Sequence, residues 1–475
     1  MNGFRTFLLW LALATLHTWF FYEQTLGFNA MLFSVILVMT VTWYHGLVRE
    51  KMWWFAAGGH LVSSIAVAWH GSSESAIVYY FSSFLLAGSV FAVRSSLPVA
   101  LLNGMAGSFG AAFVARLPVF FNFLTKKGIG RSLIAVLSKR SAYLYATPAG
   151  VTLIFYLFYS AANPDFSLNI SLPEWDIDLG FLMYFLLGVV ILCPLFFTWG
   201  FKMYVELDSS KPDILTRIRG KRKFSEKLGL LHENKQGVIM FTMLNLLILA
   251  FLGFNVLQML IPSFIKSTLN HSEQVHQGFE TLIISIVAAI LLIMYYFRAN
   301  QNFYQRKTRL VQLAATWILL NGLLALFTCY KNVLYVASFG LTYKRIWVFI
   351  GITLTMIGLY LTLSKINNLK TNWYLMRQNS WVLYFMFCSY VLVDWDRLIT
   401  WYNPNYAQFL DLEYIAGLGE TKLPYLLELV ENKDPRVLSY ENKIVAMKSR
   451  IQFSKDSWQS QTLDNQWLKR EMAEY

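Results

Sequence analysis

Apolar runs of about twenty residues recur along this chain, and that is the length of helix that crosses the hydrocarbon core of a bilayer. Inside hydrocarbon every backbone polar group needs a partner within the protein, so runs of this length favour helices over strands. The approximate bounds of the twelve runs are 5–22, 28–46, 52–70, 76–93, 97–115, 146–163, 178–202, 238–262, 277–297, 309–330, 346–364 and 379–398. We therefore predict an all-α fold, a polytopic transmembrane helical bundle of 11–12 spans.

The composition excludes the main classes of soluble protein. Only 14% of the 475 residues are charged and 56% are hydrophobic, whereas soluble proteins carry about 25% charged residues. Three cysteines are too few for a secreted disulfide scaffold. The net charge of +13 does not indicate nucleic acid, because residues 401–475 carry 9 basic and 11 acidic side chains and the excess belongs to the loops between spans. We expect membrane lipids as partners, and no nucleic acid.

The basic loops predict the orientation of the spans, because Lys and Arg are enriched in loops on the cytoplasmic side. The residues expected there are Arg49, Lys51, Arg94, Lys126, Lys127, Arg131, Lys139, Arg140, Arg298, Arg306, Lys307, Lys365, Lys370 and Arg377, with the segment 202–235. The loop 163–176 contains acidic residues and no Lys or Arg, so it should face outward. This pattern places the N-terminus inside the cell and the C-terminal tail outside.

Segment 97–115 determines on which side of the membrane the later loops lie. If this segment crossed the membrane completely, the basic residues after it would lie outside. Gly104, Gly107 and Gly110 recur there at three-residue spacing, beside Asn103. We predict a re-entrant or half-crossing element here, together with eleven true crossings elsewhere. The alternative is a complete span whose small residues pack against neighbouring helices.

Four segments make up the predicted organisation. Residues 1–201 form an N-terminal transmembrane bundle, 202–236 a basic cytoplasmic segment, 237–400 a C-terminal transmembrane bundle and 401–475 an extramembrane tail of short amphipathic helices. The tail is near the lower size limit for an independent core, so it should pack on the outer face of the membrane part. The basic segment either anchors the topology or attracts anionic lipid headgroups. Its closely spaced basic residues are Arg217, Arg219, Lys221, Arg222 and Lys223.

Strongly polar side chains within the predicted spans are costly in hydrocarbon, which makes them candidates for function. The main ones are His60, Asn103, Asn245 and Asn321. Each has two interpretations, a transport or proton pathway and an ordinary hydrogen bond between helices. The common sequence signatures of nucleotide, zinc and serine-hydrolase sites are missing, so we assign no catalytic residue, no metal ligand and no cofactor.

Charged side chains gather at the predicted outer ends of the later spans. They are His276, Glu280, Lys344, Arg345, Asp394 and Asp396. His276 and Glu280 are four residues apart and share a helix face, which suits a metal pair, a proton relay or a simple hydrogen bond at the membrane boundary. Lys344 and Arg345 lie on the outer side against the charge rule, which indicates an acidic partner on a neighbouring loop. The cluster is expected to be either a salt-bridge network or an anion or lipid-headgroup site.

Several short elements in the second half carry a family resemblance. They include His276-Gln-Gly-Phe, Tyr296-Phe-Arg298, Trp317-Ile-Leu-Leu-Asn321, Phe339-Gly-Leu-Thr342-Tyr-Lys-Arg345, Asp411-Leu-Glu-Tyr414 and Leu423-Pro424-Tyr-Leu-Leu-Glu-Leu429. Over roughly residues 236–430 the chain resembles bacterial inner-membrane proteins with a domain of unknown function of the DUF 4153 and 4173 type, and the first 200 residues match only in being hydrophobic. Lys331 stands where that family typically has an arginine. The resemblance implies an inner-membrane location and no established activity, so it supplies no catalytic residue.

Three classes of function remain open. The first is a non-catalytic membrane scaffold, sensor or assembly component that contacts a protein partner through the tail, which the missing catalytic and coupling residues favour. The second is a transporter or lipid-handling protein, which the glycine-rich segment 97–115 and the polar groups within spans favour. The third is a membrane-embedded transferase that uses His276 or the outer carboxylates.

Overall fold

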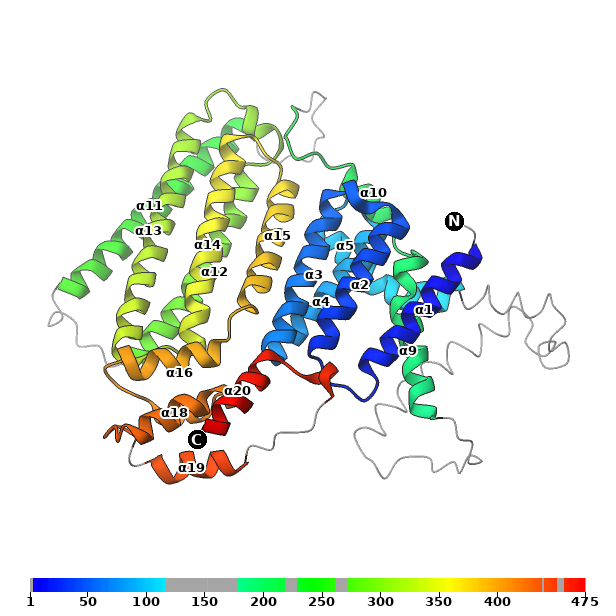
Figure 1. The fold of residues 1–475 in the computed structure, drawn as a ribbon. Helices are drawn as coiled ribbons and strands as arrows, with labels where there is room; N and C mark the ends of the chain where they lie inside the picture. Colours follow the sequence, from blue (N-terminus) through cyan, green and yellow to red (C-terminus); the bar gives the residue numbers. More distant parts are fainter. Residues whose placement is uncertain are drawn as a thin grey trace.

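The protein is described here by a computed structural model that covers residues 3–116, 152, 178–217, 229–260, 271–437, 440–450 and 457–474. The first group of long helices comprises α1 (Gly3–Phe21), α2 (Phe28–His45), α3 (Lys51–His70), α4 (Ser73–Phe91), α5 (Leu97–Gly110) and α9 (Leu179–Phe196). The second group comprises α11 (Leu230–Leu260), α12 (His271–Tyr296), α13 (Thr308–Phe339), α14 (Tyr343–Asn367) and α15 (Asn372–Tyr390). The two groups stand side by side (Figure 1).

Shorter helices lie at the two ends of these groups. They are α10 (Lys202–Ser209), α16 (Trp395–Tyr406), α17 (Leu412–Ala416), η6 (Glu420–Lys422), α18 (Leu423–Glu431), α19 (Glu441–Arg450), η8 (Trp458–Ser460) and α20 (Leu463–Glu474). Helix α10 lies at one end of the molecule, and the tail helices α16 to α20 lie across the opposite end (Figure 1). The predicted tail of short helices is therefore present, and it packs on the end face of the long helices.

The predicted all-α fold is confirmed for the part of the chain that the structure describes. Seven helices there are long and apolar enough to cross a membrane, namely α1, α2, α4, α9, α11, α13 and α14, which fits a multi-pass membrane protein. The runs predicted at 52–70, 97–115 and 277–297 are also helical, as α3, α5 followed by a π-helical turn, and α12. The run predicted at 379–398 is helical only to Tyr390, as α15, because the chain turns there and a separate helix begins at Trp395. The run predicted at 146–163 lies outside the described residues.

Apolar side chains fill the interior of each group and also the contact between the groups. The first group packs around Phe33, Trp53 and Leu192. The second packs around Phe241 and Trp317. A third core combines residues of α3, α4 and α5 with residues of α14 and α15. Within a membrane, close van der Waals packing of these side chains, together with hydrogen bonds between helices, holds the two groups together.

Helix α15 contacts α3 and α5 of the first group, and its contact with α3 includes polar groups. The Tyr384 hydroxyl donates a hydrogen bond to the backbone oxygen of Ala56 at 3.3 Å, and the thiol of Cys388 lies 3.7 Å from the oxygen of Gly59. A Cβ atom at Gly59 would overlap the hydroxyl of Tyr384. Glycine is therefore required at position 59 for the Tyr384 ring to reach α3.

The glycines of segment 97–115 allow helices to approach closely. A Cβ at Gly104 would overlap the backbone oxygen of Phe84 in α4, and a Cβ at Gly88 would overlap that of Ala100 in α5. At Gly107 an added Cβ would lie 3.0 Å from the oxygen of Trp199. The small residues thus pack against α4 and the end of α9. This is the packing that the second interpretation of segment 97–115, a helix packed through its small residues, predicts. The prediction that segment 97–115 does not cross the membrane completely is not tested, because the residues that follow Arg116 lie outside the description.

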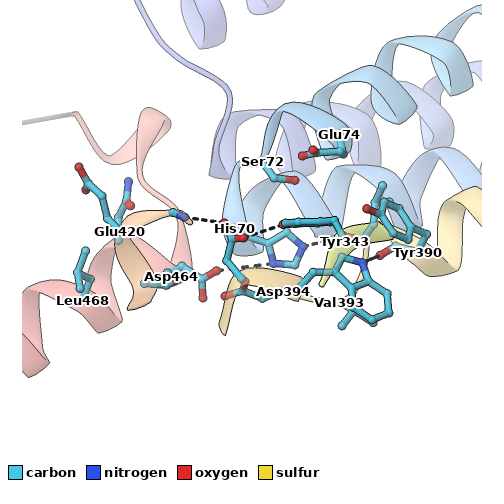
Figure 2. Close-up of a pocket in the computed structure, with 16 residues that line it drawn as sticks. His70, Ser72, Glu74, Tyr343, Tyr390, Val393, Asp394, Glu420, Asp464 and Leu468 are labelled. Atoms are coloured by element: carbon cyan, nitrogen blue, oxygen red, sulfur yellow. Dashed lines mark hydrogen bonds and ion pairs between the residues drawn. The ribbon is translucent and has the colours of Figure 1, made fainter. Parts of the chain in front are cut away.

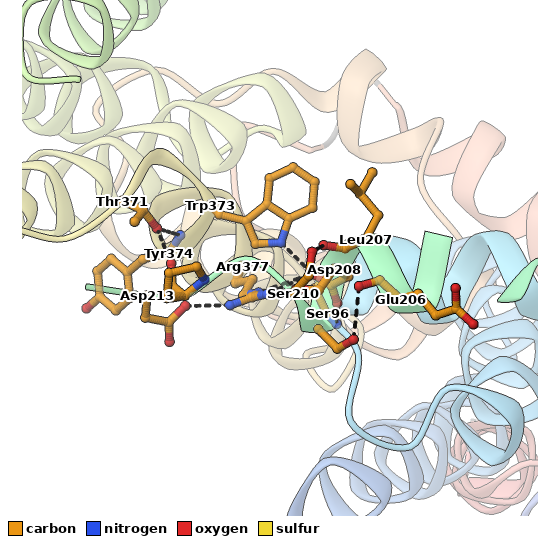
Figure 3. A network of polar contacts seen from close by, with 12 residues as sticks. Ser96, Glu206, Leu207, Asp208, Ser210, Asp213, Thr371, Trp373, Tyr374 and Arg377 are labelled. Carbon is orange, nitrogen blue, oxygen red and sulfur yellow. Dashed lines mark hydrogen bonds and ion pairs between the residues drawn. The ribbon is translucent and has the colours of Figure 1, made fainter. Parts of the chain in front are cut away.

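Asp208 ties three elements together at the α10 end (Figure 3). Its carboxylate accepts a hydrogen bond from the backbone nitrogen of Ser96 at 2.5 Å, before α5, and another from the Trp373 indole. The Arg377 guanidinium donates to the Asp208 carboxylate at 2.9 Å and to Asp213 at 2.5 Å. Burial alone would raise the pKa of Asp208, but these hydrogen bonds and the Arg377 charge outweigh it and lower the pKa.

The loops with basic residues meet at this same end. Arg94, after α4, forms an ion pair with Glu50, before α3, at 3.6 Å. Lys365, near the end of α14, donates to the backbone oxygen of Phe297 after α12 at 2.8 Å. Figure 1 places the N-terminus and α10 toward this end and the tail at the other. The fold is thus consistent with these basic loops lying on the same side of a membrane.

The tail is anchored to the first group of helices. The hydroxyl of Ser460 accepts from the backbone nitrogen of Thr25 at 3.0 Å, and the oxygen of Gln461 accepts from that of Phe28 at 3.0 Å. Gly27 lies so close that an added Cβ would overlap the Gln461 oxygen. The loop between α1 and α2 is therefore covered by the tail.

The tail is also anchored to the second group of helices. Asn403 of α16 exchanges hydrogen bonds with the backbone of Leu341, donating at 2.9 Å and accepting at 2.5 Å. The backbone nitrogen of Phe409 donates to Ser338 at 3.0 Å. Residues of α17 to α20 form a small core of their own around Ile415, Leu426 and Leu468. The tail is thus a compact unit that contacts both groups.

Candidate functional site

A polar pocket of about 260 Å³ lies where the tail meets both groups of helices. Its walls come from the end of α3, the start of α4, the start of α14, the segment from Tyr390 to Asp396, η6 and α20. Figure 2 shows His70, Asp394 and Asp464 pointing toward one another within it. The pocket therefore exists only when the tail is in place, because Asp464 belongs to the tail and His70 to α3.

His70 is the last residue of α3 and is held in one orientation. Its Nε2 atom lies 2.7 Å from the backbone oxygen of Val391, and the side chain is 7% exposed. A carbonyl oxygen only accepts, so we assign the ring proton to Nε2. The following Gly71 has a φ of +60°, which ends the helix and turns the chain toward α4. The Nδ1 atom of His70 is left facing the pocket, 3.7 Å from Asp464 Oδ2.

Asp394 and Asp464 bring two carboxyl groups to the same place. Asp394 caps α16, because its Oδ1 atom accepts from the backbone nitrogen of Arg397 at 3.0 Å. Asp464 lies in the first turn of α20 and is 4% exposed. Burial, followed by the charge of Asp394 and a hydrogen bond between the two carboxyl groups, raises the pKa of Asp464 to about 7, although Arg397 acts in the opposite direction.

Further carboxylates and aromatic rings complete the walls. Asp396 Oδ1 accepts from the Tyr343 hydroxyl at 2.8 Å, and its Oδ2 accepts from the backbone nitrogen of Gly419 at 2.9 Å. Tyr390 stacks on Trp395, with ring centroids 5.4 Å apart. Glu74 and Glu420 also line the pocket. The site is therefore acidic and partly aromatic, and within the described residues no set of three His, Cys, Asp or Glu side chains is arranged to hold a metal ion.

Arg345 has partners other than the acidic ones expected for it. Its Nη1 atom donates to the backbone oxygens of Phe339, at 2.8 Å, and Gly340. Its guanidinium stacks over the Tyr335 ring at 4.2 Å. These carbonyls are the unpaired acceptors at the end of α13, so Arg345 closes that helix. Among the described residues, the end of its own helical hairpin supplies the acceptors for Arg345. An acidic partner on α12 stays a prediction, because the side chain of Glu280 lies outside the description.

The remaining members of the predicted outer cluster separate. Lys344 is exposed, whereas its neighbour Arg345 is buried. Asp394 and Asp396 line the pocket. His276 and Glu280 lie in the first turns of α12, whose side chains there are outside the description. The structure therefore brings Asp394 and Asp396 together and does not bring Lys344 or Arg345 to them.

The polar residues predicted within spans make hydrogen bonds to neighbouring groups. His60 Nδ1 bonds the Ser82 hydroxyl at 2.9 Å, and Asn103 Oδ1 accepts from the backbone nitrogen of Phe201 at 2.6 Å. Asn245 donates to Leu313 at 3.0 Å, and Asn321 donates to Trp317 at 2.8 Å. Each side chain thus has a packing partner, which agrees with the interpretation as contacts between and within helices. Of the basic cluster, Arg217 is exposed, whereas Arg219, Lys221, Arg222 and Lys223 lie outside the description.

Of the three residues that converge in the pocket, sequence reasoning missed two, His70 and Asp464. His70 ends a predicted span before Gly71, a signal that suggested only a helix end. Asp464 follows Thr462 in the tail, where nothing in the sequence links it to a residue almost 400 positions earlier. Only the docking of the tail brings the two together.

Comparison with known proteins agrees with the resemblance in the sequence. Residues 56–429 match the family described as a domain of unknown function, DUF4153. The chain belongs to this family. The match begins within α3, well before residue 236, so DUF4153 includes much of the first helix group, and it ends before α19 and α20. No curated protein and no solved structure matches the chain. Among the pocket residues, His70, Asp394 and Asp396 lie within DUF4153, and Asp464 lies beyond it.

Proposed function

We propose that this DUF4153 protein is a non-catalytic scaffold or sensor of the bacterial cytoplasmic membrane, in which the docked C-terminal tail is the element that a protein partner contacts. The observation that carries the proposal is the anchoring of the tail to both helix groups, through Ser460 and Gln461 on one side and Asn403 on the other. A small unit with its own core, fixed on the end of a membrane bundle, is suited to presenting a defined surface.

The interior of the long helices supports this choice over transport. A transporter places polar groups around a site near the middle of the membrane. Apolar side chains predominate in the described cores, and the buried polar side chains among them have hydrogen bonds within the bundle: His60 and Ser63 bond Ser82. Asn245 and Asn321 bond to backbone oxygens. Among the described residues, a pocket lined by several carboxyl groups lies at the tail, which directs the proposal there.

The proposed orientation follows from the charges. The loops with Arg49, Arg94 and Lys370 lie at the α10 end, and the positive-inside rule assigns such loops to the cytoplasm. The N-terminus would then be cytoplasmic and the tail periplasmic. Cysteines introduced at the exposed positions Lys51 and Lys344 test this, because an impermeant thiol reagent added to intact cells should modify Lys344→Cys and spare Lys51→Cys. The reverse pattern would contradict the orientation.

A photo-crosslinking amino acid at Val445 tests the role of the tail. Val445 lies on α19 and is 51% exposed. In living cells we expect one crosslinked product of defined mass from this position, and none from Lys344 on the membrane part. The product should disappear in a Gly27→Trp chain, where the large side chain cannot fit beneath Gln461. Exposed tail positions that give no product, or a product unaffected by Gly27→Trp, would overturn the proposal.

A further inference from the structure

Three acceptor atoms converge in the pocket at the tail without a hydrogen-bond donor. They are His70 Nδ1, Asp394 Oδ2 and Asp464 Oδ2, each buried and without a hydrogen-bond partner in the part of the chain that the structure describes. The side chains of His70 and Asp464 are 7% and 5% exposed. Buried acceptors of this kind are costly when no donor satisfies them. The carboxyl groups of Asp394 and Asp464 can hydrogen-bond each other while one of them keeps its proton, but His70 Nδ1 then still lacks a donor. The convergence of the three atoms therefore indicates a missing donor.

The chemistry of the acceptors limits which kind of donor group can satisfy them. His70 Nε2 donates to Val391, so in the tautomer with one ring proton the other nitrogen, Nδ1, is an acceptor like the carboxyl oxygens. The 3.7 Å between His70 Nδ1 and Asp464 Oδ2 is too long for a hydrogen bond and leaves both atoms open to a third group. A primary ammonium group carries three N–H donors on one atom, which matches three acceptors in number.

The charges around the pocket favour a cation. Its walls include the carboxyl groups of Glu74, Asp394, Asp396, Glu420 and Asp464, and no Lys or Arg is among the described lining residues. The two nearby cations are engaged elsewhere. Arg397 donates to the Tyr425 hydroxyl at 3.0 Å and stacks on the Trp467 ring at 4.1 Å. Lys422 donates to the backbone oxygens of Ala416 and Leu418.

The aromatic walls favour an organic cation over a bare ion. Tyr343, Tyr390 and Trp395 line the pocket, and aromatic rings attract alkylammonium groups through both the ring quadrupole and apolar contact. The Tyr343 ring is fixed by its hydrogen bond to Asp396, and that of Tyr390 by its stacking on Trp395. A volume of about 260 Å³ accommodates a small molecule.

We propose that this pocket binds the primary ammonium group of a small organic cation, held by His70, Asp394 and Asp464. The ligand would join the tail to α3, since its donors would contact residues of both. Two sources share this chemistry, a free alkylamine and the ethanolamine headgroup of a lipid. The inference goes beyond the scaffold function and does not depend on the identity of the protein partner.

Titration of the full-length protein in lipid-free detergent with butylammonium chloride tests the proposal, with the heat of binding as the signal. We expect saturable binding, and at least about tenfold weaker binding of tetramethylammonium, which has no N–H donor. Asp394→Asn should weaken butylammonium binding by about tenfold or more while asparagine keeps the cap of α16. Asp434→Asn, a tail carboxylate outside the pocket, should bind as the parent does. Equal binding of the two cations, no saturable binding, or an unchanged Asp394→Asn would overturn the proposal.

Two further measurements complete the test. Protection of the α20 amides from hydrogen exchange in Asp394→Asn establishes that the tail is still docked, so a loss of binding reflects the pocket itself. Nanodiscs then separate the two sources. Butylammonium binding that is equal in phosphatidylcholine and phosphatidylethanolamine nanodiscs assigns the site to a free amine. Binding that is tenfold weaker in phosphatidylethanolamine assigns it to the lipid headgroup.

Discussion

Asp464 Oδ2 lies 3.7 Å from His70 Nδ1, and this pair joins the tail to the end of α3. The two residues are almost 400 positions apart in the sequence, and both are almost completely buried. A carboxyl group that is buried in the docked tail and exposed in the undocked tail makes docking depend on pH.

Docking of the tail should weaken as the pH rises through neutrality. The pKa of Asp464 is about 7 in the folded protein and would return to about 3.9 in an undocked tail. The docked form therefore binds more protons between these values, so its stability is greatest below about pH 4 and falls until about pH 7. Opening free energies of α20 from hydrogen exchange should decrease over this range in the parent chain and stay level in Asp464→Asn.

The control for this prediction is Asp434. Hydrogen bonds from Arg436 lower the pKa of Asp434, so Asp434→Asn should leave the decrease toward neutral pH unchanged. A parent chain whose α20 opens equally at about pH 5 and about pH 8 would show that Asp464 does not titrate with docking.

Arg345 should stabilise the turn between α13 and α14. Arg345→Gln removes the charged donors to Phe339 and Gly340 and the stacking on Tyr335, and should lower the free energy of unfolding by about 1–3 kcal/mol. Lys344→Gln removes the same charge from the exposed neighbouring position and should have almost no effect. Thermal unfolding in detergent compares the two. Equal melting temperatures for both variants would mean that the contacts of Arg345 contribute nothing.

The Asp208 network should be the most sensitive polar contact at the α10 end. Asp208 is 1% exposed, so Asp208→Ala leaves Arg377 without its buried partner and should cost about 3–5 kcal/mol. Asp213 contacts the same guanidinium with a side chain that is 45% exposed, and Asp213→Ala should cost at most about 1 kcal/mol. Unfolding in detergent measures both losses, and a reversed order would contradict the ranking by burial.

Acid should also release this network. The pKa of Asp208 is lower in the folded protein than in the unfolded chain, so its contribution is complete above about pH 4 and is lost as the pH falls through the lowered pKa. Acid unfolding midpoints of the parent and Asp208→Asn chains should therefore differ, with the parent losing more stability on acidification. Parallel acid curves for the two chains would contradict the assignment.

The contact between α4 and α5 should tolerate no added methyl group. Gly88→Ala places a Cβ against the Ala100 backbone and should cost about 1–3 kcal/mol. Gly58 in α3 has no atom within 4 Å of an added Cβ, so Gly58→Ala is the matched control and should be neutral or slightly stabilising. Melting temperatures in detergent distinguish the two, and an unchanged Gly88→Ala chain would show that the helices separate easily.

The sequence predicts the long helices well because a bilayer imposes a length and an apolar composition on each of them. The helix ends are predicted less well where polar residues continue the helix beyond the apolar run. Helix α13 continues past Tyr330 to Phe339, because Lys331 donates to Asn255 and Asn332 donates to Arg345. The partners in these contacts belong to other helices, so the hydropathy of one segment cannot predict them.

The pocket was only partly predictable. Asp394 and Asp396 stood out as charges beside a predicted span, and both line it. Arg345 stood out for the same reason, but its partners are the carbonyls of its own turn, and every helix end supplies such acceptors. Asp464 was missed because long-range docking of the tail determines its neighbours.

The central claim is that the C-terminal tail is fixed across the end of the bundle, and a disulfide measures this most directly. Thr25→Cys and Ser460→Cys, in a chain whose natural cysteines at 193, 329 and 388 are replaced by serine or alanine, place two thiols where the Ser460 hydroxyl now lies 3.0 Å from the Thr25 nitrogen. Under mild oxidation in native membranes, we predict a near-complete disulfide in the double variant and none within either single variant. A double variant whose thiols both stay reduced and react freely with a thiol reagent would contradict the docked tail.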